Sequence, residues 1–170
     1  MNIVECEIPS QSALTSGPAA YFQDAWCVPL SKDALGVVDI FQAVFGHRLL
    51  WMKLVLVARN WVVKPFGLET ATAHKIFTPP VLQYYSVGDK IGSWPIFELS
   101  EKELVAGRDN SHLNFRVSIL KISIPSPAVV ISTVCHVHNP GGKAYLRVIK
   151  PFHRFGVRVL LDNALRNGRL

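Results

Sequence analysis

The sequence predicts an α+β fold in which a curved antiparallel sheet wraps around a long C-terminal helix. Two changes of periodicity indicate it. Through residues 94–138 apolar and polar side chains alternate with a period of two, and short turn segments interrupt them, as expected for the strands of a meander. From residue 143 the period becomes helical, with bases on one face and apolar side chains on another. Because a curved sheet needs its concave face filled, this helix is the element expected to fill it.

Two helices are predicted between the first strand and the meander. A strand over residues 21–30 is followed by a typical helix start, and apolar side chains then keep helical spacing until Gly46. A second helix is predicted over residues 49–63 and ends at Pro65-Phe-Gly67. Residues 68–85 have no clear period. We predict a loop, with a short strand as the alternative, and expect mobility here more than elsewhere in the chain.

The meander and the terminal helix complete the expected fold. Asn139-Pro-Gly-Gly142 is the predicted start of the helix, and Pro151 is expected to kink it because proline lacks a backbone donor. The order strand, two helices, meander and long helix is that of the helix-grip fold of START-like and polyketide-cyclase-like proteins. We expect a single domain over residues 1–170, with a flexible segment over 1–17. The predicted strands of the meander are 94–99, 103–108, 112–124 and 128–138, the last two joined by Pro125-Ser-Pro127.

Composition favours a cytoplasmic location. Cys6, Cys27 and Cys135 are odd in number and lack a Cys-x-x-Cys spacing, which suits a reducing compartment. The N-terminus is acidic and has no signal-peptide pattern. The most hydrophobic stretch, residues 49–63, contains charged side chains and is shorter than the roughly 20 residues that span a bilayer.

The net charge of +6 is carried entirely by residues 143–170, which hold seven bases and one acid. As a solvated helix face, this basic stripe needs no partner. As a docking surface, it would meet an anionic membrane surface or an acidic protein. Nucleic acid is not the expected partner, because no recognised nucleic-acid motif is present. The bases at helical spacing are Lys143, Arg147, Lys150, Arg154 and Arg158.

A polar face on the third strand of the meander carries the candidate chemistry. His112, Asn114, Arg116 and Ser118 alternate along this strand, so they share one face, while Leu113 and Phe115 point to the other. If the turn between the two strands is centred on Ser126, Arg116 lies opposite His136 on the next strand, and Asn114 lies opposite His138. The polar face either meets water, with Leu113 and Phe115 packed on the terminal helix, or projects Arg116 and the histidines into a pocket that binds an acid group.

No metal, cofactor or nucleophile is predicted. His136-x-His138 with His112 resembles part of a metal site, but no carboxylate or thiolate completes it. The chain has no Gly-x-Ser-x-Gly elbow and no phosphate-binding glycine loop.

Three motifs resemble an uncharacterised bacterial family that is catalogued only as a domain of unknown function. They are Val87-Gly-Asp-Lys-Ile-Gly92, Asn110-Ser-His-Leu-Asn-Phe-Arg116 and Lys150-Pro-Phe-His-Arg154, within a likeness over residues 18–165. The resemblance implies a helix-grip (SRPBCC) fold. Family members occur alone or fused behind a nicotinamide-binding reductase domain, and this chain resembles the stand-alone form. An Asp often stands in that family where this chain has Asn114, so the resemblance supports the fold more than any shared reaction.

The expected function is binding of a small apolar or amphipathic ligand between the sheet and the C-terminal helix. One alternative is an enzyme of polyketide-cyclase or isomerase type, with His136 or His112 as general base and Arg116 stabilising enolate charge. Another is a non-catalytic docking module that acts through the basic helix. The predicted ligand-binding residues are Trp94, Leu113, Phe115, Arg116, His136, Val137, Tyr145, Phe152 and Phe155.

Overall fold

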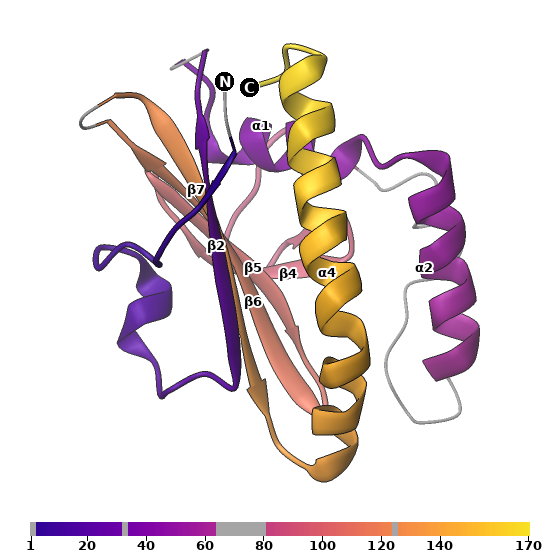
Figure 1. Ribbon diagram of the computed structural model, residues 1–170. Coiled ribbons are helices and arrows are strands. Elements are labelled where there is room, and N and C mark those ends of the chain that lie inside the picture. The colour runs from indigo at the N-terminus through magenta and orange to yellow at the C-terminus, as the bar shows by residue number, and fades with distance from the viewer. Residues whose placement is uncertain (1–2, 32–33, 64–80, 124–125) are drawn as a thin grey trace.

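A seven-stranded antiparallel sheet with a long C-terminal helix on one face forms the body of the protein (Figure 1). The computed structural model describes residues 3–31, 34–63, 81–123 and 126–170. The strand order is β1-β2-β7-β6-β5-β4-β3. The predicted α+β class with a terminal helix against an antiparallel sheet is therefore confirmed.

The elements follow one another in the expected order. The strands are β1 (Val4–Glu5), β2 (Phe22–Pro29), β3 (Lys90–Ile91), β4 (Trp94–Leu99), β5 (Glu103–Asp109), β6 (Leu113–Ile122) and β7 (Ala128–Val137). The helices are the 3-10 turn η1 (Ala13–Ser16), α1 (Val37–Phe41), the π turn η2 (Gln42–Gly46), α2 (Leu50–Val63) and α4 (Pro140–Arg166). The predicted strands and the helix over 49–63 match these bounds to within two residues.

The first predicted helix is shorter than its apolar spacing indicates. It begins at Val37, where the Asp39 carboxylate accepts a hydrogen bond from the backbone N–H of Gly36 at 3.1 Å. Its last turn, η2, widens to π geometry, and this turn buries three consecutive side chains, Ala43, Val44 and Phe45. A regular helix would turn one of the three away from the core.

The predicted register between β6 and β7 was wrong by two residues. Arg116 pairs with Val134 and Asn114 pairs with His136. Ile122 pairs with Ala128, so the pairs are symmetric about position 125, whereas the prediction centred the turn on Ser126. A shift of two keeps every side chain on its predicted face. Leu113 and Phe115 accordingly face the helices, as expected in the interpretation in which the polar face of this strand meets water.

The main core lies between the sheet and the helices. Trp26, Val28 and Ile131 are among the helix-facing side chains of β2 and β7, and each is no more than 7% exposed. Ile40 from α1 and Leu161 from α4 are fully buried against the same cluster. Alternation along the strands therefore decides which side chains contact the helices.

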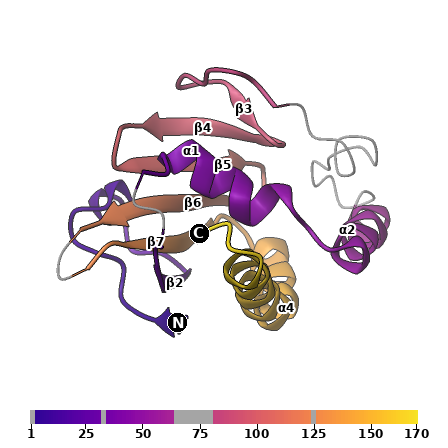
Figure 2. The same ribbon diagram turned by 90° about the horizontal axis from the view of Figure 1, so that it is seen from above.

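Helix α2 forms a separate outer layer. Figures 1 and 2 show it on the far side of α4 from β2 and β7. The rings of Trp51 and Phe155 lie 6.2 Å apart between centroids, and the Arg59 side chain donates to the Tyr145 hydroxyl. The contact partners on α4 have lower residue numbers as the residue numbers on α2 increase, so the two helices run antiparallel.

Some predictions fall outside the described residues. Residues 68–80 of the expected loop are outside the described ranges, and so are Pro65-Phe-Gly67 and Pro125. Helix α4 continues through Pro151 as one element, and the kink at that residue stays a prediction. Within the described ranges no single helix is both long and apolar enough to cross a membrane.

Candidate functional site

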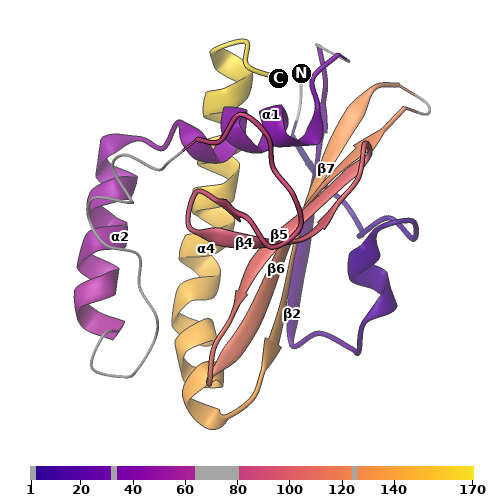
Figure 3. The ribbon, with the colours of Figure 1, turned by 180° about the vertical axis from the view of Figure 1, so that it is seen from behind.

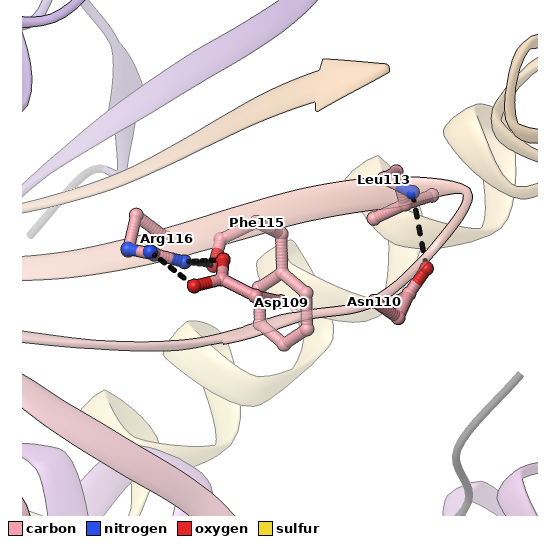
Figure 4. A network of polar contacts seen from close by, with 5 residues as sticks. All are labelled: Asp109, Asn110, Leu113, Phe115 and Arg116. Carbon is pink, nitrogen blue, oxygen red and sulfur yellow. Dashed lines mark hydrogen bonds and ion pairs between the residues drawn. The ribbon is translucent and has the colours of Figure 1, made fainter. Parts of the chain in front are cut away.

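Arg116 lies on the sheet face that points away from α4, and its charge is already paired. Its Nη1 and Nη2 donate to the two carboxylate oxygens of Asp109 at 2.6 and 3.0 Å (Figure 4). The guanidinium carbon lies 3.5 Å from the ring centroid of Phe97. Asp109 is the last residue of β5, so this pair ties two neighbouring strands together. In one of the two interpretations Arg116 would bind the acid group of a ligand, and in the structure its guanidinium is bound to the Asp109 carboxylate.

The same outer face is closed in part by the N-terminal segment. Figure 3 shows η1 on the opposite side of the sheet from α4 and α2. The buried carboxylate of Glu103 accepts hydrogen bonds from the Ser12 hydroxyl at 2.6 Å, the Ala13 backbone N–H at 3.0 Å and the Ser118 hydroxyl. Segment 1–17, expected to be flexible, thus contains residues that are hydrogen-bonded to the sheet.

His136 and His112 each have a structural partner. Nε2 of His136 lies 3.0 Å from the carbonyl oxygen of Pro18, beside a hollow of about 430 Å³ that Pro18 and Val134 help to line. Nδ1 of His112 lies 3.1 Å from Oδ1 of Asn139, the residue that caps α4. The weak catalytic candidates His112, Arg116 and His136 therefore take part in separate contacts. Among the described residues no group of three or more His, Cys, Asp or Glu side chains is placed to hold a metal.

The helix-facing side of the sheet carries a cluster of aromatic rings at the end where α1 crosses it. Trp94 is its centre, with ring centroids 5.8 Å from Phe41, 5.5 Å from Phe45 and 5.4 Å from Phe115. Trp94 and Phe115 pack against the core but stay half-buried rather than buried. Each of these two residues therefore keeps part of its surface accessible.

Arg48 joins this cluster from the segment between η2 and α2. Its guanidinium carbon lies 5.9 Å from the centroid of the Trp94 ring. Within the described ranges no carboxylate forms an ion pair with it. Burial lowers the pKa of the Arg48 guanidinium below its usual value, because a cation that has lost water without gaining an anion is disfavoured. Arg48 is thus a half-buried cation next to half-buried aromatic rings.

A second polar group lies between β2 and α4. The side chain of Asp24 is fully buried, and Nε2 of His153 lies 3.4 Å from its Oδ1 and 3.3 Å from its Oδ2. Only the first contact has hydrogen-bond geometry, and Oδ2 accepts no hydrogen bond from the described residues. The imidazole stands edge-on to Phe22 at 5.6 Å between centroids. Burial and the nearby Asp24 carboxylate raise the pKa of the Cys135 thiol to about 12.

The predicted ligand-binding residues divide into three groups. Arg116 and His136 lie on the outer face, so they cannot line one cavity with the helix-facing residues. Phe152 and Phe155 are 67% and 61% exposed on α4. The residues on the helix-facing side are Trp94, Leu113, Phe115, Val137 and Tyr145.

Sequence reasoning missed Asp24, Arg48 and His153. The sequence does indicate the burial of Asp24, because Asp24 alternates with Phe22 and Trp26 along β2 and must share their buried face. His153 stands within the quoted motif Lys150-Pro-Phe-His-Arg154 but was not singled out. Nothing in the local pattern distinguishes Arg48, since its position depends on how η2 turns into α2.

Comparison with known proteins identifies one related family. Residues 17–160 match the profile of a family described as "Protein of unknown function (DUF2867)". No curated protein and no solved structure matches the chain significantly.

Proposed function

Since the chain belongs to the DUF2867 family, whose description names no activity, we propose from its geometry that it binds a small amphipathic molecule with an acidic group. The apolar part of this ligand lies between the helix-facing side of the sheet and α4, next to Trp94 and Phe115. The acidic group lies against Arg48.

The topology supports a helix-grip fold as part of this proposal. Strands β2, β7, β6, β5, β4 and β3 are neighbours in that order, and α1 and α2 are inserted between β2 and β3. The last helix lies against the face that also carries the aromatic cluster (Figure 2). Proteins with this arrangement hold ligands between sheet and helix. The fold does not specify the ligand, so its chemistry has to be inferred from the residues of the site.

Arg48 is the observation that carries the proposal. Removing a guanidinium from water is costly unless an anion pairs with it. Arg116 shows the usual solution, with Asp109 bound through two hydrogen bonds. Arg48 has no such partner within the described ranges. A ligand carboxylate would supply the missing charge through the same two-bond geometry.

A specific observation favours a second candidate function, general acid–base catalysis on the bound molecule. The buried Asp24 carboxylate holds the imidazole of His153 between β2 and α4. A carboxylate that orients an imidazole is a common arrangement for moving a proton. This candidate replaces His112 and His136 with His153 as the base.

Binding of a fatty acid tests the proposal directly. We expect dodecanoate to raise the melting temperature of the wild-type protein, and dodecanol, which has the same chain without the charge, to raise it less. Arg48→Met keeps the apolar stem and removes the charge, so it should weaken dodecanoate binding at least about tenfold, because a charge-assisted hydrogen bond contributes roughly 1.5–3 kcal/mol.

Lys102→Met is the matched control, because Lys102 is exposed in the turn between β4 and β5. It should bind dodecanoate as the wild type does. Equal dodecanoate affinity in Arg48→Met and wild type, or no preference for the acid over the alcohol, would overturn the role of Arg48.

A further inference from the structure

We propose that α2 and the outward side of α4 form a docking surface for an anionic lipid bilayer. The surface is defined by Leu50, Trp51, Leu54 and Trp61 of α2 with Phe152 and Phe155 of α4, and we refer to it as the aromatic surface. It is separate from the ligand site proposed above, which lies on the side of α4 that faces the sheet.

The aromatic surface exposes large apolar side chains that a core would normally bury. Trp61 is 82% exposed, Phe152 67%, Leu50 65%, Phe155 61%, Leu54 55% and Trp51 44%. Single exposed apolar residues are common in soluble proteins, but a contiguous group of this kind marks an interaction site. Tryptophan and phenylalanine are also the side chains that settle at the boundary between lipid headgroups and acyl chains.

The six side chains belong to one surface because the two helices are neighbours. Trp51 and Phe155 lie 6.2 Å apart between ring centroids. Further along the pair, Nε of Arg59 donates to the Tyr145 hydroxyl at 3.0 Å. Figures 1 and 3 show α2 alongside the N-terminal part of α4. A planar partner can therefore contact both helices at once.

The charges around the aromatic surface favour anionic lipid as the occupant. Helix α2 contains the bases Lys53 and Arg59 and no acid. Helix α4 contains six bases and one acid, Asp162, which pairs with Arg166 at 2.8 Å. On a helical projection the bases Arg147 and Arg158 follow one stripe beside the stripe of Phe152 and Phe155. Arg154 lies on the same stripe but already forms an ion pair with Glu5 of β1. Aromatic side chains flanked by bases are typical of helices that lie on anionic membranes.

A second copy of the chain fits the surface less well. A two-fold contact through this face would place the bases of one α4 against those of the other, and like charges that meet in an interface repel. An anionic bilayer presents negative charge to the bases and acyl chains to the rings, so it satisfies both groups at once.

Sedimentation with vesicles tests the proposal. The full chain should bind vesicles of phosphatidylcholine mixed with phosphatidylglycerol and not vesicles of phosphatidylcholine alone, and added salt should weaken the binding. The fluorescence of wild-type protein should shift to shorter wavelength on binding, and the shift should shrink in Trp61→Phe. Arg147→Gln/Arg158→Gln should bind at least about tenfold more weakly, as should Leu54→Ser/Trp61→Ser.

Matched controls separate this surface from general charge and hydrophobicity. Lys90→Gln/Lys102→Gln removes exposed bases from the strand side, and Val87→Ser removes a side chain that is 61% exposed before β3. Both should bind as the wild type does, and all variants should keep its circular dichroism spectrum. Absence of binding to anionic vesicles, or equal loss in the controls, would overturn the proposal. A stable dimer that loses its association in Leu54→Ser/Trp61→Ser would instead assign the surface to a contact between copies.

Discussion

At the scale of single residues, two arginines on opposite faces of the sheet differ in what surrounds them. Arg116 pairs with Asp109 and stacks on Phe97, so it stabilises the link between β5 and β6. Arg48 contacts the Trp94 ring and has no acid partner within the described ranges. The same side chain is therefore structural at one position and a candidate for ligand recognition at the other.

Cys135 gives the protein a predictable response to alkaline pH. Its pKa is raised to about 12 by burial and by the Asp24 carboxylate, so the folded state keeps the thiol protonated where the unfolded chain has already lost the proton. Stability from this group is complete below pH 9, the ordinary thiol value, and is lost as pH rises toward the folded pKa.

Urea unfolding between pH 8 and pH 11, in wild type and Cys135→Ala, measures this effect. We expect the free energy of unfolding to fall with pH in both proteins, and to fall less steeply in Cys135→Ala by up to one proton per molecule. Identical pH dependence in the two proteins would contradict the assignment.

The site could be predicted from the sequence only where alternation carries the information. The division of β6 into two faces follows from its period of two, and it correctly places Phe115 toward the helices. Asp24 was open to the same argument on β2. Arg48 was not, because the π turn η2 and the start of α2 decide where its side chain lies, and neither leaves a periodic signal.

At the scale of elements, the start of α4 is fixed by a close contact with the end of the meander. The Asn139 side chain accepts from the backbone N–H of Gly142 at 3.0 Å, as expected of an N-cap residue. The backbone N–H of His138 donates to the carbonyl oxygen of His112 at 2.9 Å. A Cβ atom at Gly142 would lie 2.3 Å from that same carbonyl oxygen, so only glycine fits.

Two adjacent glycines allow a matched test of this contact. Gly142→Ala should lower the free energy of unfolding by roughly 1–3 kcal/mol, the usual cost of forcing an extra group into a packed site. At Gly141 the atom nearest to a new Cβ is Oδ1 of Asn139 at 3.3 Å, a tight contact that a small shift relieves, so Gly141→Ala should lose less stability than Gly142→Ala. Thermal melts measure this difference. A higher melting temperature for Gly142→Ala than for Gly141→Ala would contradict the close contact at Gly142.

The elements differ in how well sequence predicts them. The strands were found because alternation and turn residues agree, and the start of α4 was found because Asn139 and Pro140 form a typical N-terminus. The register of β6 and β7 was missed because two prolines around Ser126 left the centre of the turn undetermined. The position of α2 was not predictable either, since apolar side chains occur on most of its surface and select no single packing partner.

At the scale of the whole molecule, the two faces of the sheet are covered by different parts of the chain. The N-terminal segment closes the outer face through the hydrogen bonds of Glu103. The inner face holds the core, the aromatic cluster with Arg48, and the Asp24–His153 pair. Beyond it, α4 and α2 add a basic and aromatic exterior. The proposed ligand site lies inside the fold, and the proposed docking surface lies outside it.

Native mass spectrometry of the protein purified from its own host tests the central claim, ligand binding at Arg48, most directly. Wild-type protein should retain one small acidic molecule, which denaturing extraction releases for identification. Arg48→Met, expressed in the same way, should be recovered without it while keeping the wild-type fold. Wild-type protein that carries no ligand and also fails to bind dodecanoate would contradict the account, and so would equal retention of the ligand by Arg48→Met.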